Sequence, residues 1–467
     1  MKTTKEPTTP TCTSKGRLLD NINVKKFFIE NYPILAVIVG YLLVAFSIGP
    51  YYNGDSAWET QAVQGVMKYG LPYTNGFYLM DQPPLGFYIQ AVFAKAFGLS
   101  LGNGTFLVTL FGLGTVILVY LIGREVYNKT TGFFAALLFA FSPWQLILSR
   151  TFLIDVQCLF FSLLSLFVGI EAIKKGSFKL IVGCGFIFAA AFSTKLYAAF
   201  MLIPLLVYFV YRGPKRLKQM ILWVVGFALP GLFFSYLWYQ TITGLGLFSI
   251  FGHTDFNVSN PAGFVPTYFF ATNFLISYGL GWFFIDAIVL SLLVYLIQRR
   301  LSRNFLVFDM ICVVVIVSAL SVNTVLGVAL NLKAPYLDAV KYDFQTLPFF
   351  SFLAASLISK SLVEFNSAKI KLRRSKIAFY TVALVGVFLV LASVFYNMRF
   401  VNLFSSANYL IFRVEPTVNV GYSLFNSALT SGNTVYIQLF GFAVALSGLF
   451  WIARQKINST LKFILKK

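Results

Sequence analysis

Residues 51–90 read YYNGDSAWETQAVQGVMKYGLPYTNGFYLMDQPPLGFYIQ, and this stretch decides how the rest of the chain is interpreted. It holds the acids Asp55, Glu59 and Asp81, with two prolines shortly after Asp81, and it follows a long apolar segment. A chain that only turns round at a membrane surface needs a few residues for the turn. A polar stretch of about forty residues therefore indicates a functional surface, because binding and catalytic groups gather on long loops.

The composition indicates a polytopic membrane protein. Of the 467 residues, 58% are hydrophobic and 11% are charged, whereas a soluble domain has about 25% charged residues. A spanning helix needs about 20 apolar residues, and we predict about twelve such helices. We expect them at residues 33–50, 105–122, 131–148, 155–172, 179–194, 196–211, 220–240, 271–297, 305–322, 345–359, 378–397 and 434–453. The expected fold is all-α, with a long first extracytoplasmic loop that carries interfacial helices.

The net charge of +21 orients the chain. Most Lys and Arg residues fall in the two tails and in every second loop, and the positive-inside rule assigns these segments to the cytoplasm. Short basic loops bind anionic lipid, so the lipid bilayer is the expected partner and nucleic acid is not. We predict a disordered cytoplasmic tail over 1–27, a transmembrane domain over 28–455 and a basic cytoplasmic tail over 456–467.

The acids of the outer loops are the first candidates for chemistry. Asp55 follows the first span, where a carboxylate is compatible with a general base, a metal ligand, a substrate anchor or a solvated helix cap. Glu59 lies one turn later in the same expected helix and has the same alternatives. Asp155 borders an apolar run, where an uncompensated acid is costly, so it is either functional or paired with Arg150 five residues earlier.

Three basic residues lie at outer span ends: Arg150, Lys195 and Lys341. A phosphate at the level of the lipid headgroups requires such cations. The alternative is that they are anchors whose long side chains reach the membrane surface.

Other acids and the single histidine carry weaker signals. His253 and Asp255 form a His-x-Asp pattern that is compatible with a divalent metal. Nothing in the sequence requires a cofactor. Asp309 lies close to the cytoplasmic end of a span and is expected to reach water.

Four phrases together resemble the GT-C membrane glycosyltransferases, specifically the protein O-mannosyltransferase and aminoarabinose-transferase-like group. They are GDSAWETQAVQGVMKYGLPYTNG (54–76), MDQPPLGFYIQAVFAKAFG (80–98), LSRTFLIDVQCLFF (148–161) and KYDFQTLPFFSFLAA (341–355). The resemblance covers the first 200 residues well and the remainder loosely.

This resemblance implies an inverting transfer of a hexose, pentose or mannose-like sugar from a polyprenyl-phosphate donor. The acceptor would be a protein, lipid or glycan hydroxyl on the extracytoplasmic face. Asp55 matches the catalytic base and Asp155 matches the acid of the second outer loop, so both are catalytic candidates. Arg150 and Lys195 match basic positions near the donor phosphate, where fixed cations stabilise the charge of the leaving group.

The chain departs from the group's pattern at three positions. Ser56 follows Asp55 where the group has a second acid, Gln82 stands where it has His or Lys, and Lys341 stands where it has Arg. Glu59, Asp81, Gln82 and Lys341 remain donor-binding candidates with Arg150 and Lys195. These departures leave a catalytically inactive relative as one alternative. The alternative from another class is a twelve-span transporter or flippase of a lipid-linked or small polar substrate.

Overall fold

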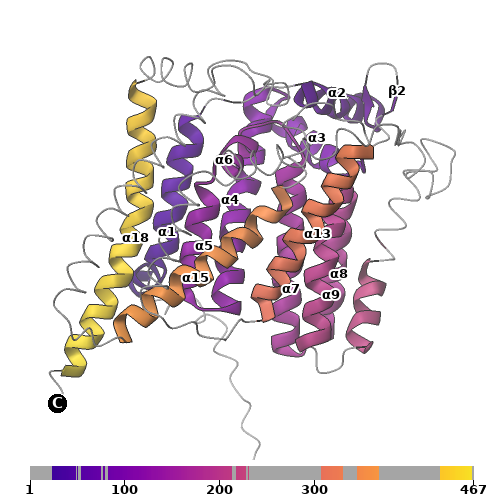
Figure 1. Ribbon diagram of the computed structural model, residues 1–467. Coiled ribbons are helices and arrows are strands. Elements are labelled where there is room, and N and C mark those ends of the chain that lie inside the picture. The colour runs from indigo at the N-terminus through magenta and orange to yellow at the C-terminus, as the bar shows by residue number, and fades with distance from the viewer. Residues whose placement is uncertain are drawn as a thin grey trace, which may run out of the picture.

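The computed structural model is a helical bundle with one short β-hairpin in the part of the chain that it describes (Figure 1). The described residues are 24–48, 50, 54–74, 77–78, 82–212, 217–227, 230, 307–329, 344–367 and 432–464. The helices are α1 (Val24–Ser47), α2 (Gly54–Tyr69), α3 (Leu85–Phe97), α4 (Leu101–Val126), α5 (Lys129–Ala140), α6 (Pro143–Ser149), α7 (Asp155–Lys175), α8 (Phe178–Thr194), η1 (Leu196–Met201), α9 (Leu202–Arg212), α13 (Val307–Ala329), η5 (Phe344–Thr346), α15 (Leu347–Ser367) and α18 (Gly432–Ile464). The strands are β1 (Tyr73–Thr74) and β2 (Phe77–Tyr78), which pair antiparallel.

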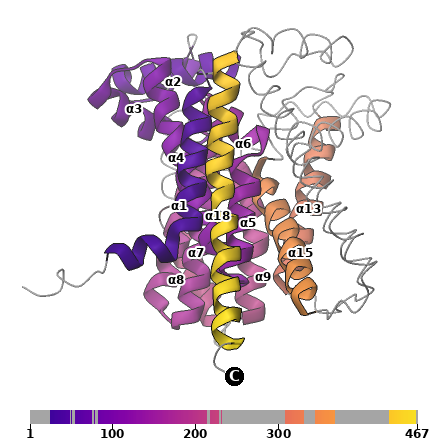
Figure 2. The same cartoon turned by 90° about the vertical axis from the view of Figure 1, so that its left-hand side faces the viewer.

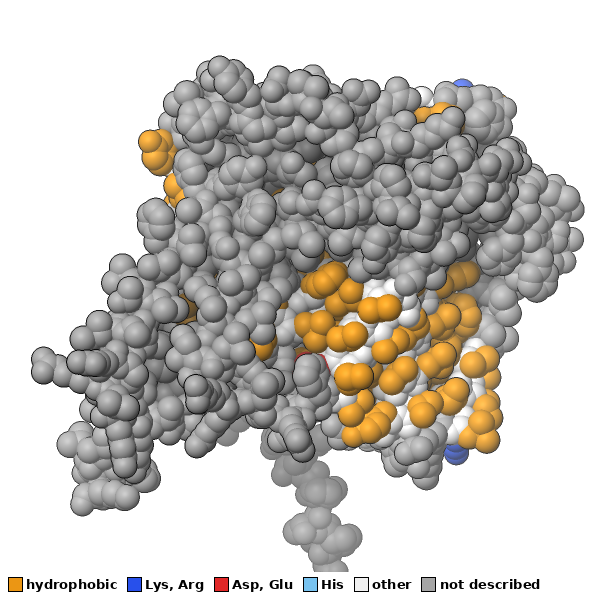
Figure 3. Space-filling model, viewed as in Figure 1, with side chains coloured by type: hydrophobic (Ala, Val, Ile, Leu, Met, Phe, Trp, Pro, Cys, Tyr) orange, Lys and Arg blue, Asp and Glu red, His pale blue; other side chains and the backbone are white. Residues whose placement is uncertain are grey.

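The described helices are those of a multi-pass membrane protein. By length and composition, three of them can each cross a membrane: Phe28–Ser47, Leu101–Val126 and Asp155–Lys175. Figure 3 shows hydrophobic side chains gathered at the lower right, where Figure 1 places α13 and α9. Apolar side chains that face outward in this way suit a lipid environment. The number of twelve spans stays a prediction, because several of the expected spans lie outside the described residues.

The predicted span 131–148 is bent. It is two helices, α5 and α6, with a bend of 63° between them. Pro143 begins α6, where its missing N–H leaves no hydrogen bond unmade. The hydroxyl of Ser142 caps the new helix by accepting a hydrogen bond from the backbone N–H of Gln145 (3.3 Å). This Ser-Pro pair favours a new helix over the continuation of the old one, so the chain bends before α6, and Arg150 follows at the end of α6.

The first and last described helices lie side by side, as Figure 2 shows for α1 and α18. They approach closely at a pair of glycines. A Cβ added to Gly40 would come within 2.3 Å of the carbonyl oxygen of Gly441. Small residues at such crossings let two backbones pack directly, which is how membrane helices commonly associate. Helix α1 starts within the tail that was predicted to be disordered, and α18 continues to Ile464.

Helices α2 and α3 lie across one end of the bundle and do not run along it (Figures 1 and 2). The first loop thus contains two helices, and their position at the membrane interface stays a prediction. The hydroxyl of Tyr88 on α3 donates to the carbonyl of Gly70 at the end of α2 (2.7 Å), and burial raises the pKa of Tyr88 above its ordinary value. Together with the paired strands β1 and β2, α2 and α3 form a cover over this end of the bundle.

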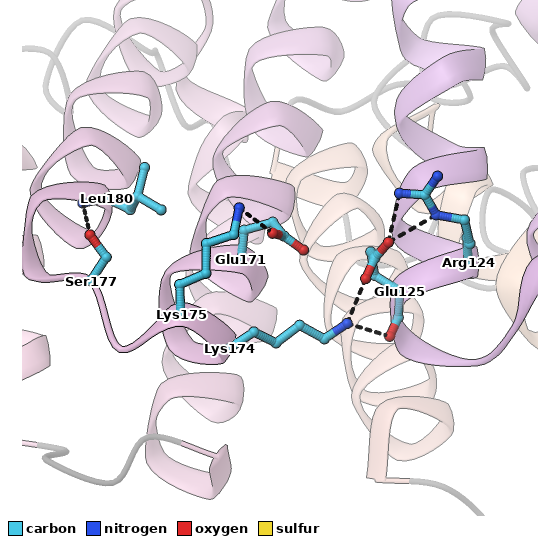
Figure 4. Close-up of polar contacts among 7 residues, drawn as sticks. All are labelled: Arg124, Glu125, Glu171, Lys174, Lys175, Ser177 and Leu180. Carbon is cyan, nitrogen blue, oxygen red and sulfur yellow. Dashed lines mark hydrogen bonds and ion pairs between the residues drawn. The ribbon is translucent and has the colours of Figure 1, made fainter. Parts of the chain in front are cut away.

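The C-terminal end of α7 carries partly exposed ion pairs (Figure 4). Lys174 bonds to Glu125 at the end of α4 (2.6 Å), and Glu125 also pairs with Arg124.

Asp309 was expected to reach water, and this expectation is wrong. The side chain is buried, because α13 packs on the bundle and the hydroxyl of Tyr127 donates to its carboxylate (2.5 Å).

Candidate active site

A buried ion pair lies at the covered end of the bundle. The ammonium of Lys195 donates to Oδ2 of Asp155 at 2.7 Å, and both residues are buried. Asp155 is the first residue of α7, and Lys195 is the residue that ends α8. An acid at a helix N-terminus and a base at a C-terminus are each stabilised by the helix dipole, so the backbone favours this placement.

The other oxygen of Asp155 is also engaged. The hydroxyl of Tyr197 on η1 donates to Oδ1, and the Lys195 ammonium lies 5.2 Å from the centre of the Tyr197 ring. The chain leaves the α-helical path at Lys195 and resumes as η1, which brings Lys195 and Tyr197 to the same carboxylate. Both oxygens of Asp155 thus accept hydrogen bonds, which a buried carboxylate requires.

Arg150 follows α6 and contacts the end of α1 and the helix α4. Its Nε donates to the carbonyl of Ile48 (3.0 Å), and its Nη1 donates to the hydroxyl of Thr109 on α4 (3.3 Å). The guanidinium also lies over the ring of Phe46, 5.5 Å from its centre. The sequence suggested Arg150 as the partner of Asp155. The ion pair that the structure shows for Asp155 is with Lys195, because α7 and α8 pack against each other.

Buried polar residues support the segment that carries Arg150. The hydroxyl of Tyr41 donates to Ser149 (2.8 Å), and the amide of Gln145 donates to Ser149 (3.1 Å) and to the carbonyl of Gly112 (3.3 Å). Sequence reasoning missed these residues. The available signal was Gln145 and Ser149, two polar residues four apart within an apolar run.

The first-loop helix contacts this site through Glu59. Its Oε2 accepts a hydrogen bond from the backbone N–H of Ile154 at 2.9 Å, and only 3% of Glu59 is exposed. Helix α2 begins at Gly54, so Asp55 lies within its first turn and not at the cap position suggested by the sequence. Asp55 and Glu59 are one turn apart on this helix, as expected.

The segment that contains Pro83, Pro84 and the start of α3 also contacts this site. A Cβ added to Gly86 would come within 2.7 Å of Ile154 and 3.1 Å of Thr194, so α3 can approach both residues only because position 86 is a glycine. Gln82 precedes this helix and is half-buried. Its amide oxygen has no hydrogen-bond partner among the described residues.

Four predicted residues lie outside the described part of the chain: Asp81, Lys341, His253 and Asp255. No group of three or more His, Cys, Asp or Glu side chains that could hold a metal occurs among the residues the structure describes. The predicted metal candidates therefore stay predictions.

The comparisons with known proteins bear on the segment that carries this site. Residues 81–239, which include Arg150, Asp155 and Lys195, match the family model described as "Dolichyl-phosphate-mannose-protein mannosyltransferase". The chain is 28% identical over 180 residues to "Putative mannosyltransferase YkcB" of Bacillus subtilis, an alignment that covers 38% of this chain and 25% of that protein. It is 31% identical over 135 residues to "Putative mannosyltransferase YycA" of the same organism, covering 29% of this chain and 20% of that protein.

The fold gives an independent likeness. The crystal structure of ArnT from Cupriavidus metallidurans bound to undecaprenyl phosphate matches with a TM-score of 0.55 and 15% sequence identity, covering 91% of this chain and 78% of ArnT. The chain resembles the GT-C membrane glycosyltransferases, as its sequence predicted. The alignments with the two Bacillus proteins cover a quarter or less of their lengths, so they compare part of each molecule.

Proposed function

We propose that this chain is an integral membrane glycosyltransferase. It would transfer a sugar from a polyprenyl-phosphate donor to a hydroxyl group on the extracytoplasmic face, with inversion. The observation that carries this proposal is the buried Asp155–Lys195 pair, together with the buried Arg150, within the segment that matches the family model.

The leaving group explains the cations. When the bond between sugar and phosphate breaks, the lipid phosphate gains negative charge, and preorganised cations lower the barrier in a site that excludes water. Arg150 is held in place by Ile48 and Thr109, and Lys195 by Asp155. Asp155 has both oxygens engaged, so we assign it the positioning of Lys195 and Tyr197. This role differs from the direct catalytic role suggested by the resemblance.

Asp55 is assigned as the base. It would take the proton from the acceptor hydroxyl while the oxygen attacks the sugar carbon opposite the phosphate, as in inverting sugar chemistry generally. The family model and the two Bacillus relatives are named for mannosyl transfer, which favours a mannose-like sugar among the hexoses and pentoses. The undecaprenyl phosphate named for ArnT supports a donor of the polyprenyl-phosphate type. The pattern of Lys and Arg supports a cytoplasmic location of both termini.

The position of the charges favours an enzyme over a transporter or flippase. Transporters commonly bind substrate near the middle of the membrane, at broken helices. Asp155 begins α7 and Lys195 is the C-cap of α8, so this ion pair lies at helix ends, next to the contacts of α2 and α3 with Ile154 and Thr194.

Donor turnover by the purified full chain tests the proposal. The protein is incubated in lipid nanodiscs with radiolabelled polyprenyl-phosphate mannose, other hexoses or a pentose, and with hydroxyl acceptors, and release of polyprenyl phosphate is measured. General-base catalysis typically contributes about 10²–10⁴-fold, so Asp55→Asn should reduce turnover by that factor. Gln64→Ala, at an exposed position of α2, is the matched control and should retain activity. Absence of turnover with every donor, or full activity of Asp55→Asn, contradicts the proposal.

A further inference from the structure

Helix α2 buries one of its faces. Ala62, Val63 and Val66 are buried against α3 and the segment before α7, while Gln64 and Lys68 are exposed. Glu59 precedes Ala62 and Val63 by three and four residues, so it lies on the buried face. Asp55 lies one turn before Glu59 in the backbone of the same helix.

An acid at this position is unexpected on packing grounds alone. Buried apolar side chains, among them Phe87, Phe152 and Ile154, pack with Ala62 and Val63 of the same helix. A leucine would suit such surroundings, whereas a buried carboxylate is costly unless it is hydrogen-bonded. The presence of Glu59 therefore calls for a role that an apolar side chain cannot fill.

The hydrogen bond of Glu59 identifies that role. Ile154 occupies the cap position of α7, and its own side chain supplies no cap hydrogen bond. The carboxylate of Glu59 accepts from the Ile154 N–H at 2.9 Å, and this polar contact joins α2 to the start of α7. The next residue is Asp155, which holds Lys195. One hydrogen bond thus links the helix that carries Asp55 to the residue beside the buried ion pair.

We propose that Glu59 is a positioning residue that fixes α2, and with it Asp55, relative to the Asp155–Lys195 pair. This inference rests on the proposed function, in which Asp55 acts on one side of the sugar and the cations act on the phosphate. A misplacement of about 1 Å between reacting groups can cost about 10²-fold in rate. Loss of the Glu59–Ile154 hydrogen bond should therefore lower kcat. It differs from the donor-binding role that the sequence suggested for Glu59, which would act on KM through direct contact with the donor.

Two substitutions separate the roles. In Glu59→Gln the amide oxygen still accepts from the Ile154 N–H, whereas Glu59→Leu fills the space without an acceptor. We expect Glu59→Gln to keep kcat within about 3-fold of the natural chain, and Glu59→Leu to lower kcat by about 10²-fold with little change in the donor KM. Gln64→Leu, on the exposed face of α2, is the matched control and should change neither constant.

Hydrogen–deuterium exchange provides a measurement that does not depend on turnover. Glu59→Leu should accelerate exchange at the Ile154 amide and over residues 54–69, whereas Glu59→Gln should not. Equal loss of activity in both variants would show that the negative charge itself is used, and would overturn the inference. Unchanged kcat or unchanged exchange in Glu59→Leu would also overturn it. If the natural chain turns over no donor, the proposed function fails and exchange alone decides whether Glu59 holds α2 to α7.

Discussion

The two ends of α7 carry the same kind of interaction in opposite surroundings. At its N-terminal end, Asp155 pairs with Lys195 at 2.7 Å, and the two side chains are 0% and 7% exposed. At its C-terminal end, Lys174 pairs with Glu125 at 2.6 Å, and these side chains are 43% and 20% exposed (Figure 4). The distances are nearly equal, so burial is what distinguishes the two pairs.

This difference in burial changes what each pair can do. Water and salt screen an exposed pair, which typically contributes about 0–1 kcal/mol. Burying an ion pair costs hydration free energy, and the attraction between the two charges barely offsets that cost. Stability alone is therefore a weak explanation for a buried pair. The residues beside the Asp155–Lys195 pair, Ile154 and Thr194, contact α2 and α3, and we interpret the pair as part of the site. The Lys174–Glu125 pair is interpreted as a surface contact between α7 and α4.

The largest effect is expected when one member of the buried pair is removed. Lys195→Met should lower stability by about 3–5 kcal/mol, because Asp155 would remain charged and buried without its cation. The thermal midpoint of the protein in nanodiscs measures this loss.

The double variant Lys195→Met/Asp155→Asn sharpens the same comparison. It removes both charges and leaves an amide oxygen for the Tyr197 hydroxyl, so most of the lost stability should return while donor turnover stays low. Full activity of the double variant would show that this pair is structural only.

A smaller effect is expected for Arg150→Lys. A lysine is a single point charge and cannot reproduce the separate Nε and Nη1 contacts with Ile48 and Thr109. The donor KM should rise by about tenfold, which corresponds to about 1.4 kcal/mol. Arg124→Lys, at the exposed end, is the control and should leave the donor KM unchanged. An equal rise of the donor KM in Arg150→Lys and Arg124→Lys would contradict a special role for the buried end of the bundle.

Gly86→Ala tests the close approach of α3. The added Cβ would crowd Ile154 and Thr194, and such overpacking costs about 1–3 kcal/mol. The control is Gly183→Ala on α8, where nothing lies within 4 Å of the added atom and a small gain in helix stability is expected. Thermal midpoints of the two variants should therefore move in opposite directions, and equal shifts would argue against tight packing at Gly86.

The smallest effect is expected for Lys174→Ala. Removing an exposed pair should cost less than about 1 kcal/mol, and the difference from the natural chain should shrink in high salt. Thermal midpoints at low and high salt measure it. A loss as large as that of Lys195→Met would mean that burial does not separate the two pairs.

Part of the fold and part of the candidate site could be predicted from the sequence. The acids and prolines of residues 51–90 predicted interfacial helices in the first loop; the structure has the helices α2 and α3 there, and their interfacial position stays a prediction. Asp155, Arg150 and Lys195 were each selected from their positions at span ends, and the structure places all three among buried residues at the covered end of the bundle. The role of Glu59 was not predictable, because its partner is the backbone N–H of Ile154, 95 residues further along the chain.

The sequence by itself determined the membrane character, the apolar segments and the residue types available for the site, because these follow from local composition and spacing. Only the tertiary structure decided which charges meet. Asp155 pairs with Lys195, 40 residues away, because α7 packs on α8, whereas the neighbour chosen from the sequence was Arg150. Likewise, Gly40 and Gly441 acquire a role only once α1 lies against α18. Contacts between distant segments depend on how whole helices pack, and no local pattern of residues specifies that packing.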